Sequence, residues 1–166
     1  DRPFKTGEWA YAGSIRVENP FASVGDGVYK ASYHHVEATG VGTPNFAPKT
    51  EGITLQFDQD FGDIGVFGKY SRTWGRKAAV EQFAHAGIMW TRPFGYEEDN
   101  WGVGFGWVDP TAANTRDEYV AETFYKMQVT PFVSVTADAM LVINPSSNPN
   151  GNDTEGVFSV RSRMHF

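Results

Sequence analysis

Residues 154–166 read TEGVFSVRSRMHF, and alternate positions in this segment carry two different kinds of side chain. One set is mainly apolar: Phe158, Val160, Ser162, Met164 and Phe166. The other set is polar and basic: Ser159, Arg161, Arg163 and His165. Because successive side chains of a strand point to opposite faces, this strand separates an apolar environment from a wet one. A soluble sandwich buries the apolar face, whereas a membrane barrel turns it outward and keeps its interior polar.

The same period of two recurs along the chain and predicts strands throughout, with no convincing helical stripe. The clearest segment is FVSVTADAMLVIN at 132–144, where every second residue from Val133 to Ile143 is apolar. Each segment is near the roughly 9–11 residues that a tilted membrane strand needs. The nine predicted strands are 7–18, 27–37, 52–60, 63–73, 82–91, 100–108, 117–129, 132–144 and 154–166.

The composition suits one all-β domain over residues 1–166. The chain is 40% hydrophobic and 15% aromatic, with 18 glycines, which favours many short strands with tight turns. Its net charge of −6 argues against a nucleic-acid partner. It contains no cysteine, which excludes thiol catalysis and disulfides. No apolar run approaches the roughly 20 residues of a spanning helix, whereas a barrel strand is apolar only at alternate positions.

The links between predicted strands alternate in length from the second strand onward. Long polar links fall at 38–51, 74–81, 109–117 and 144–153. Short links fall near 61–62, at 93–99 and at 130–131. Outer-membrane barrels have short periplasmic turns and long external loops, so this alternation predicts an antiparallel transmembrane barrel.

The odd number of strands predicts that the barrel is larger than this chain. If the link 144–153 is external, Phe166 ends at the periplasmic side and the first strand starts outside the cell. A complete bacterial barrel normally has an even strand count and both ends on the periplasmic side. We therefore expect residues 1–166 to form part of a larger barrel, with the N-terminal strands absent or on another chain.

The stretch YKMQVTPFVSVTADAMLVINPSSNPNGND, residues 125–153, resembles the C-terminal portion of the carbohydrate-selective porin family. The matching motif residues are Gln128, Thr130, Pro131, Asn144 and Pro145. Segments 62–75 and 27–35 resemble earlier strands of the family. The resemblance implies an outer-membrane barrel of about sixteen strands that passes sugars by facilitated diffusion. It implies no cofactor, and by analogy with other porins it makes a homo-trimer a possible assembly. The family's N-terminal half is not matched.

If the apolar faces meet lipid, the opposite faces line the solute path. The charged and imidazole side chains predicted to line it are Glu8, Arg16, Lys30, His34, Asp58, Lys69, His85, Glu118, Glu122, Lys126, Asp138, Arg161, Arg163 and His165. Guanidinium and carboxylate groups hydrogen-bond sugar hydroxyls. Phe67, Phe83 and Phe124 are candidates for stacking on sugar faces, and Gly102, Gly104 and Gly106 leave that face bare. A purely structural role is the alternative for each charge, because lumen charges also pair across strands.

Aromatic residues on the outward faces predict a membrane girdle near the strand ends. The members are Trp9, Tyr11, Tyr29, Tyr70, Trp90, Trp101, Trp107, Tyr119 and Phe166. Core packing in a sandwich is the alternative interpretation of the same residues.

The sequence predicts a bacterial outer-membrane channel that is not an enzyme. His34 and His35 point to opposite faces of one strand, so they do not chelate one metal. The predicted partners are a sugar solute, the lipid bilayer and the missing half of the barrel. Two other functions stay open. One is a structural barrel that anchors or binds a partner in an envelope complex; the other is a small closed barrel that binds a lipophilic ligand.

Overall fold

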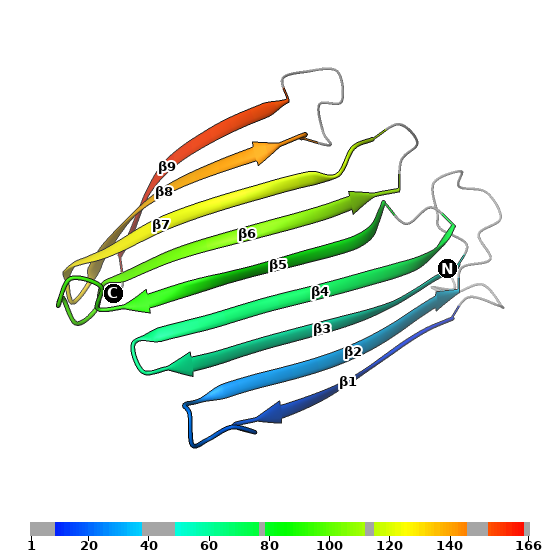
Figure 1. The fold of residues 1–166 in the computed structure, drawn as a ribbon, viewed down its shortest axis with the longest axis horizontal. Helices are drawn as coiled ribbons and strands as arrows, with labels where there is room; N and C mark the ends of the chain where they lie inside the picture. The colour runs from blue at the N-terminus through cyan, green and yellow to red at the C-terminus, as the bar shows by residue number, and fades with distance from the viewer. Residues whose placement is uncertain (1–8, 38–48, 77–78, 112–114, 146–152, 165–166) are drawn as a thin grey trace, which may run out of the picture.

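The computed structural model describes residues 9–37, 49–76, 79–111, 115–145 and 153–164. In these ranges the chain forms one antiparallel sheet whose strands lie side by side in chain order (Figure 1). The strands are β1 (Trp9–Glu18), β2 (Gly27–Glu37), β3 (Lys49–Phe61), β4 (Ile64–Arg76), β5 (Val80–Thr91), β6 (Asn100–Pro110), β7 (Glu118–Thr130), β8 (Val133–Ile143) and β9 (Thr154–Met164). The predicted all-β, antiparallel fold and the nine strands are confirmed. Among the described residues, no helix is long and apolar enough to cross a membrane.

The sheet has two ends, which the link positions define. The hairpin end carries the links 19–26, 62–63, 92–99 and 131–132. The loop end carries the links 38–48, 77–79, 111–117 and 144–153. In Figure 1 the hairpin end lies at the left and the loop end at the right.

The predicted alternation of link lengths is wrong in the middle of the chain. Only residues 77–79 separate β4 from β5 at the loop end, whereas 92–99 at the hairpin end is longer. The polar residues around 74–76 suggested a loop in the sequence. The ladder with β3 nevertheless continues to Trp74 and Arg76, because Glu51 and Lys49 pair with them across the strands.

The sheet is a single layer in the part of the chain that the structure describes. Each strand contacts only its neighbours in the sheet, and β1 and β9 do not pair with each other. The backbone groups inside the sheet are therefore satisfied laterally, strand to strand. The outer edges of β1 and β9 have no partner strand among these residues.

The Gln-x-Thr-Pro motif builds the turn between β7 and β8. The Gln128 side-chain amide donates to the Thr130 carbonyl at 2.8 Å, and the Phe132 N–H donates to the Thr130 hydroxyl at 3.2 Å. Pro131 lacks an N–H, so it fits a hairpin corner where no ladder partner is available. At the far end of β8, Asn144 adopts a φ of 54° and its N–H donates to the Asp153 carbonyl at 2.8 Å. The motif residues therefore fix both ends of β8.

A buried carboxylate attaches the link 92–99 to β7. Asp99 is only 3% exposed and accepts hydrogen bonds from the Gln128 N–H, at 2.9 Å, and from the Tyr125 hydroxyl. Arg92, at the other end of the link, forms an ion pair with Asp63 in the neighbouring turn. These contacts join two of the hairpin-end links, 62–63 and 92–99, to the end of β7.

We predict that Asp99→Ala destabilises the hairpin end. Removal of a buried, charge-assisted acceptor leaves the Gln128 N–H without its partner and costs about 1.5–3 kcal/mol. The measurement is urea unfolding of the reconstituted protein, followed by the heat-modifiable band on SDS gels. Glu97→Ala, an exposed change in the same link, is the control. An Asp99→Ala midpoint equal to that of Glu97→Ala would contradict the assignment.

Candidate solute path on one face of the sheet

The strand register divides the side chains into two faces. Residues paired across antiparallel strands share a face, so one face can be followed from β1 to β9. One row of paired residues runs Ile15, Ala31, Leu55, Tyr70, Ala84, Trp107, Tyr119, Ile143 and Thr154. We name the face that contains this row the apolar face. The opposite face carries the alternate residues of every strand, and we name it the polar face.

All described residues that the sequence predicted for the solute path share the polar face. They are Arg16, Lys30, His34, Asp58, Phe67, Lys69, Phe83, His85, Glu118, Glu122, Phe124, Lys126, Asp138, Arg161 and Arg163. Glu8 and His165 lie outside the described residues.

The apolar face is the more exposed of the two, which is the reverse of a soluble sheet. In β8 the side chains of 137, 139, 141 and 143 are exposed, whereas 138, 140 and 142 are half-buried. Ile15 and Phe158 are each 72% exposed and Val160 is 64% exposed, whereas Ser134 on the polar face is 4% exposed. Nearly all large hydrophobic side chains that are exposed on strands lie on the apolar face; Met89 and Val157 are the exceptions. The apolar face therefore lacks a protein cover among the described residues.

Aromatic residues of the apolar face gather at both ends of the sheet. Trp90 and Trp101 lie near the hairpin end, with ring centroids 6.3 Å apart. Trp9, Tyr11, Trp107 and Tyr119 lie near the loop end. Tyr29 lies near the hairpin end, but Tyr70 is at the middle of β4 and not near a strand end, contrary to prediction. Phe166 is outside the described residues.

The polar tips of two of these rings form hydrogen bonds, one at the loop end and one inside the sheet. The Trp107 indole N–H donates at 3.0 Å to Asp117, which lies just before β7 at the loop end. The Trp101 indole N–H donates at 2.9 Å to the hydroxyl of Thr123, in the middle of β7. The Trp107 ring, with an apolar body and a tip hydrogen-bonded at the loop end, suits the boundary between hydrocarbon and water.

The height of the apolar face matches a bilayer. Ile64 and Trp74 are the outermost exposed hydrophobic residues of this face on β4, and Arg72 lies between them near the loop end. Ten residues separate them, which is about 34 Å along a strand at roughly 3.4 Å per residue. A strand tilted by about 40° would then rise roughly 25 Å, the height of the apolar band of outer-membrane barrels.

A row of three cations and one imidazole, which we name the cation row, crosses the first half of the polar face. Arg16, Lys30, Lys69 and His85 occupy one row on β1, β2, β4 and β5, with Gln56 between them on β3. Arg16 pairs with Glu18 at 2.9 Å. Among the described residues, no ion pair is formed by Lys30 or Lys69; the Lys69 ammonium lies 6.0 Å from the centroid of Phe83. These two ammonium groups therefore have no carboxylate partner in the part of the chain that the structure describes.

A second cluster occupies the polar face of β7, β8 and β9. The Glu122 and Asp138 carboxyl groups interact with each other, and the Arg161 guanidinium acts on Glu122 with opposite charge. Phe124, Lys126, Thr136 and Arg163 line the same hollow, which has a volume of about 590 Å³. Sequence reasoning missed Ser134 and Thr136 in this wall, because single hydroxyl residues carry no motif of their own. The structure thus separates the predicted residues into two groups.

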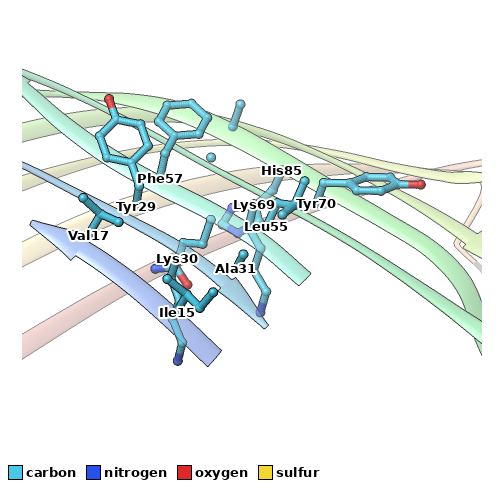
Figure 2. Close-up of a pocket in the computed structure, with 13 residues that line it drawn as sticks. Ile15, Val17, Tyr29, Lys30, Ala31, Leu55, Phe57, Lys69, Tyr70 and His85 are labelled. Atoms are coloured by element: carbon cyan, nitrogen blue, oxygen red, sulfur yellow. The ribbon is translucent and has the colours of Figure 1, made fainter. Parts of the chain in front are cut away.

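An apolar hollow of about 530 Å³ lies on the opposite face (Figure 2). Its floor is made by the small residues Ala31, Gly68 and Ala86, and its walls by larger side chains such as Leu55 and Phe57. Figure 2 shows the Tyr29 and Phe57 rings on one side of the strands and the Lys30 side chain on the other. The hollow is a feature of the apolar face and does not belong to the solute path.

The model of the carbohydrate-selective porin, OprB family matches residues 5–166. The chain belongs to this family. No curated protein and no solved structure matches the chain. The family is one of outer-membrane channels and not of enzymes. The matched residues include all nine strands of the sheet. The resemblance seen in residues 125–153 is thereby confirmed.

In this OprB-family chain, each face of the sheet also carries some residues of the opposite character. Arg72 and Gln82 lie on the apolar face toward the loop end, where Gln82 accepts a hydrogen bond from the Tyr70 hydroxyl at 2.8 Å. Arg72 lies 3.4 Å from Glu81 and stacks over Trp74. Val120, Met140 and Val142 are apolar residues on the polar face. The strands were predicted from the majority of their alternate positions, so single residues that break the pattern were not singled out in advance.

We predict opposite outcomes for arginine at two adjacent positions in the middle of β3. Leu55 is exposed on the apolar face, and Gln56 is exposed on the polar face. Leu55→Arg places a charge in hydrocarbon and reduces folding into bilayers by about 2–4 kcal/mol, whereas Gln56→Arg leaves folding nearly unchanged. Folding into lipid vesicles, measured against urea, tests the difference. Equal losses, or a larger loss for Gln56→Arg, would reverse the assignment of the faces.

Proposed function

We propose that this chain forms part of the wall of a water-filled channel in the bacterial outer membrane, through which small sugars diffuse down their gradient. The single observation that carries the proposal is the inverted distribution of side chains, with the large hydrophobic residues exposed and the charged residues gathered on the other face. That distribution suits lipid outside and water inside. Membership of a family of carbohydrate-selective porins supports the choice of sugars as the solute.

The polar face offers hydroxyl-binding groups of both signs. Lys30 and Lys69 present ammonium donors on one part of the wall, while Glu122, Asp138 and Arg161 present acceptors and a donor on another. A sugar carries many hydroxyl groups that both donate and accept, so a wall of mixed charge provides partners along its path. The individual contacts are weak and repeated, as conduction requires.

The unpaired edges of β1 and β9 are where the barrel would be completed. A strand edge in a membrane leaves backbone groups without partners, at a cost of several kcal/mol for each group. We therefore propose that further strands, from an N-terminal half or from another chain, pair with these edges. Lipid would cover the apolar face, including the hollow over Ala31, Gly68 and Ala86. A homo-trimer is the assembly proposed by analogy with other porins.

We predict that the reconstituted protein conducts ions and that its wall charges set ion selectivity. Lys30→Glu and Lys69→Glu each reverse one charge of the cation row and shift the zero-current potential in a KCl gradient toward cation selectivity. Arg116→Glu makes the same charge change in a loop-end link and is the control. The measurement is planar-bilayer recording.

Two results would overturn the channel proposal in this experiment. Correctly folded protein that never conducts would favour a structural anchor in the envelope. Conductance whose selectivity responds to neither lysine would mean that the polar face does not line the path.

A further inference from the structure

Three phenylalanines surround a strip of glycines on the polar face. Gly102, Gly104 and Gly106 occupy alternate positions on β6, so this strand presents bare backbone to the polar face. Phe67 and Phe83 approach from β4 and β5, and Phe124 approaches from β7. The result is a hollow of about 270 Å³ with a glycine floor and aromatic walls.

Two of the rings rest directly on glycine backbone. A Cβ atom at Gly102 would lie 2.3 Å from Cε1 and 2.6 Å from Cζ of Phe124. A Cβ atom at Gly87, on the adjacent strand β5, would lie 2.4 Å from Cζ of Phe67. Any side chain at either glycine would displace the ring. Each ring is thus packed against the wall and keeps another side available to the space above the sheet.

Gly104 lies between these rings and is uncovered. The nearest atom to a Cβ placed there is the Ala86 carbonyl oxygen, at 3.8 Å. Phe67, Gly87, Gly104 and Glu122 form one cross-strand row, so a ring and a carboxylate flank the open position. His85 also lines the hollow, with its ring centroid 5.3 Å from that of Phe83.

Flat apolar surfaces beside a hydrogen-bonding rim suit a pyranose ring. A pyranose has C–H bonds on its ring faces and hydroxyl groups at its perimeter, so it packs against aromatic rings while its edge remains polar. Shaped, mainly apolar hollows with a few polar groups are the usual form of a small-molecule site. An acyclic polyol of similar size lacks the rigid face and gains less from the same surface.

We propose that the hollow over Gly104 is a stacking site for the ring face of a neutral pyranose. The ring packs on Phe67 and Phe124, and its hydroxyl groups reach Glu122 and His85. This inference rests on the proposed channel function and deepens it, because it makes cyclic sugars the preferred solutes. The site retards no solute for long, since it is open to the lumen and its contacts are weak.

The test compares D-glucose with sorbitol, an acyclic polyol of the same carbon number, in swelling assays of liposomes that contain the native protein. Wild-type protein is expected to admit glucose faster than sorbitol after correction for size. Gly104→Val puts a branched side chain into the hollow, at a position where its Cβ has no neighbour closer than 3.8 Å, and should abolish that preference. Gly156→Val is the matched control, because Gly156 lies on the apolar face with nothing within 4 Å of an added Cβ. Phe124→Leu removes one flat ring and should also abolish the preference.

Ion conductance of the same preparations shows that each variant has assembled. Loss of the glucose preference in Gly104→Val and Phe124→Leu, with conductance retained and Gly156→Val unchanged, supports the site. The proposed site is overturned if wild-type protein admits glucose and sorbitol at equal rates after correction for size. It is also overturned if the preference for glucose survives both substitutions. Failure of the wild-type protein to conduct or to admit either solute overturns the channel function itself.

Discussion

The structure depends on one constraint: a strand in hydrocarbon satisfies its backbone N–H and C=O groups only by pairing with neighbouring strands. The antiparallel ladders from β1 to β9 meet this requirement throughout the interior of the described sheet. Lateral pairing needs no second layer, so both faces of the sheet are free to meet different surroundings. The same constraint is the reason for the proposal that other strands pair with the edges of β1 and β9.

The two faces of the sheet carry different side chains, and those of the polar face are the ones that a solute would meet. The apolar face carries aromatic residues near both ends, and at the loop end the Trp107 indole is hydrogen-bonded to Asp117. The polar face carries one group of cations on β1, β2 and β4 and a second group on β7 and β9, where an interacting carboxyl pair from β7 and β8 accompanies them. Between these groups lies the glycine strip of β6, where backbone and phenylalanine rings replace charge. A sugar crossing this wall would therefore meet ionic groups and an aromatic surface in close succession.

The sequence was sufficient to predict the nine strands and the face of each described residue assigned to the solute path or the girdle, because side-chain orientation repeats every two residues. It did not predict where β4 ends and β5 begins, since Trp74 and Arg76 are polar-flanked and read as a loop, yet pair with β3. The alternation of link lengths failed for the same reason. The contact of Phe124 with Gly102 depends on the register between β6 and β7, which no single strand encodes. Phe67, Phe124 and the glycines were each recognisable in the sequence, but their close packing was not.

The most direct test of the account is a cysteine scan along β8, which is possible without background because the chain contains no cysteine. Single cysteines at 136, 137, 139, 140 and 141 would be exposed, in intact outer membranes, to a thiol reagent that is soluble only in water. The account predicts reaction at 136 and 140 and protection at 137, 139 and 141. Reaction at 137, 139 and 141 with protection at 136 and 140 would contradict it, and so would uniform reaction at all five positions.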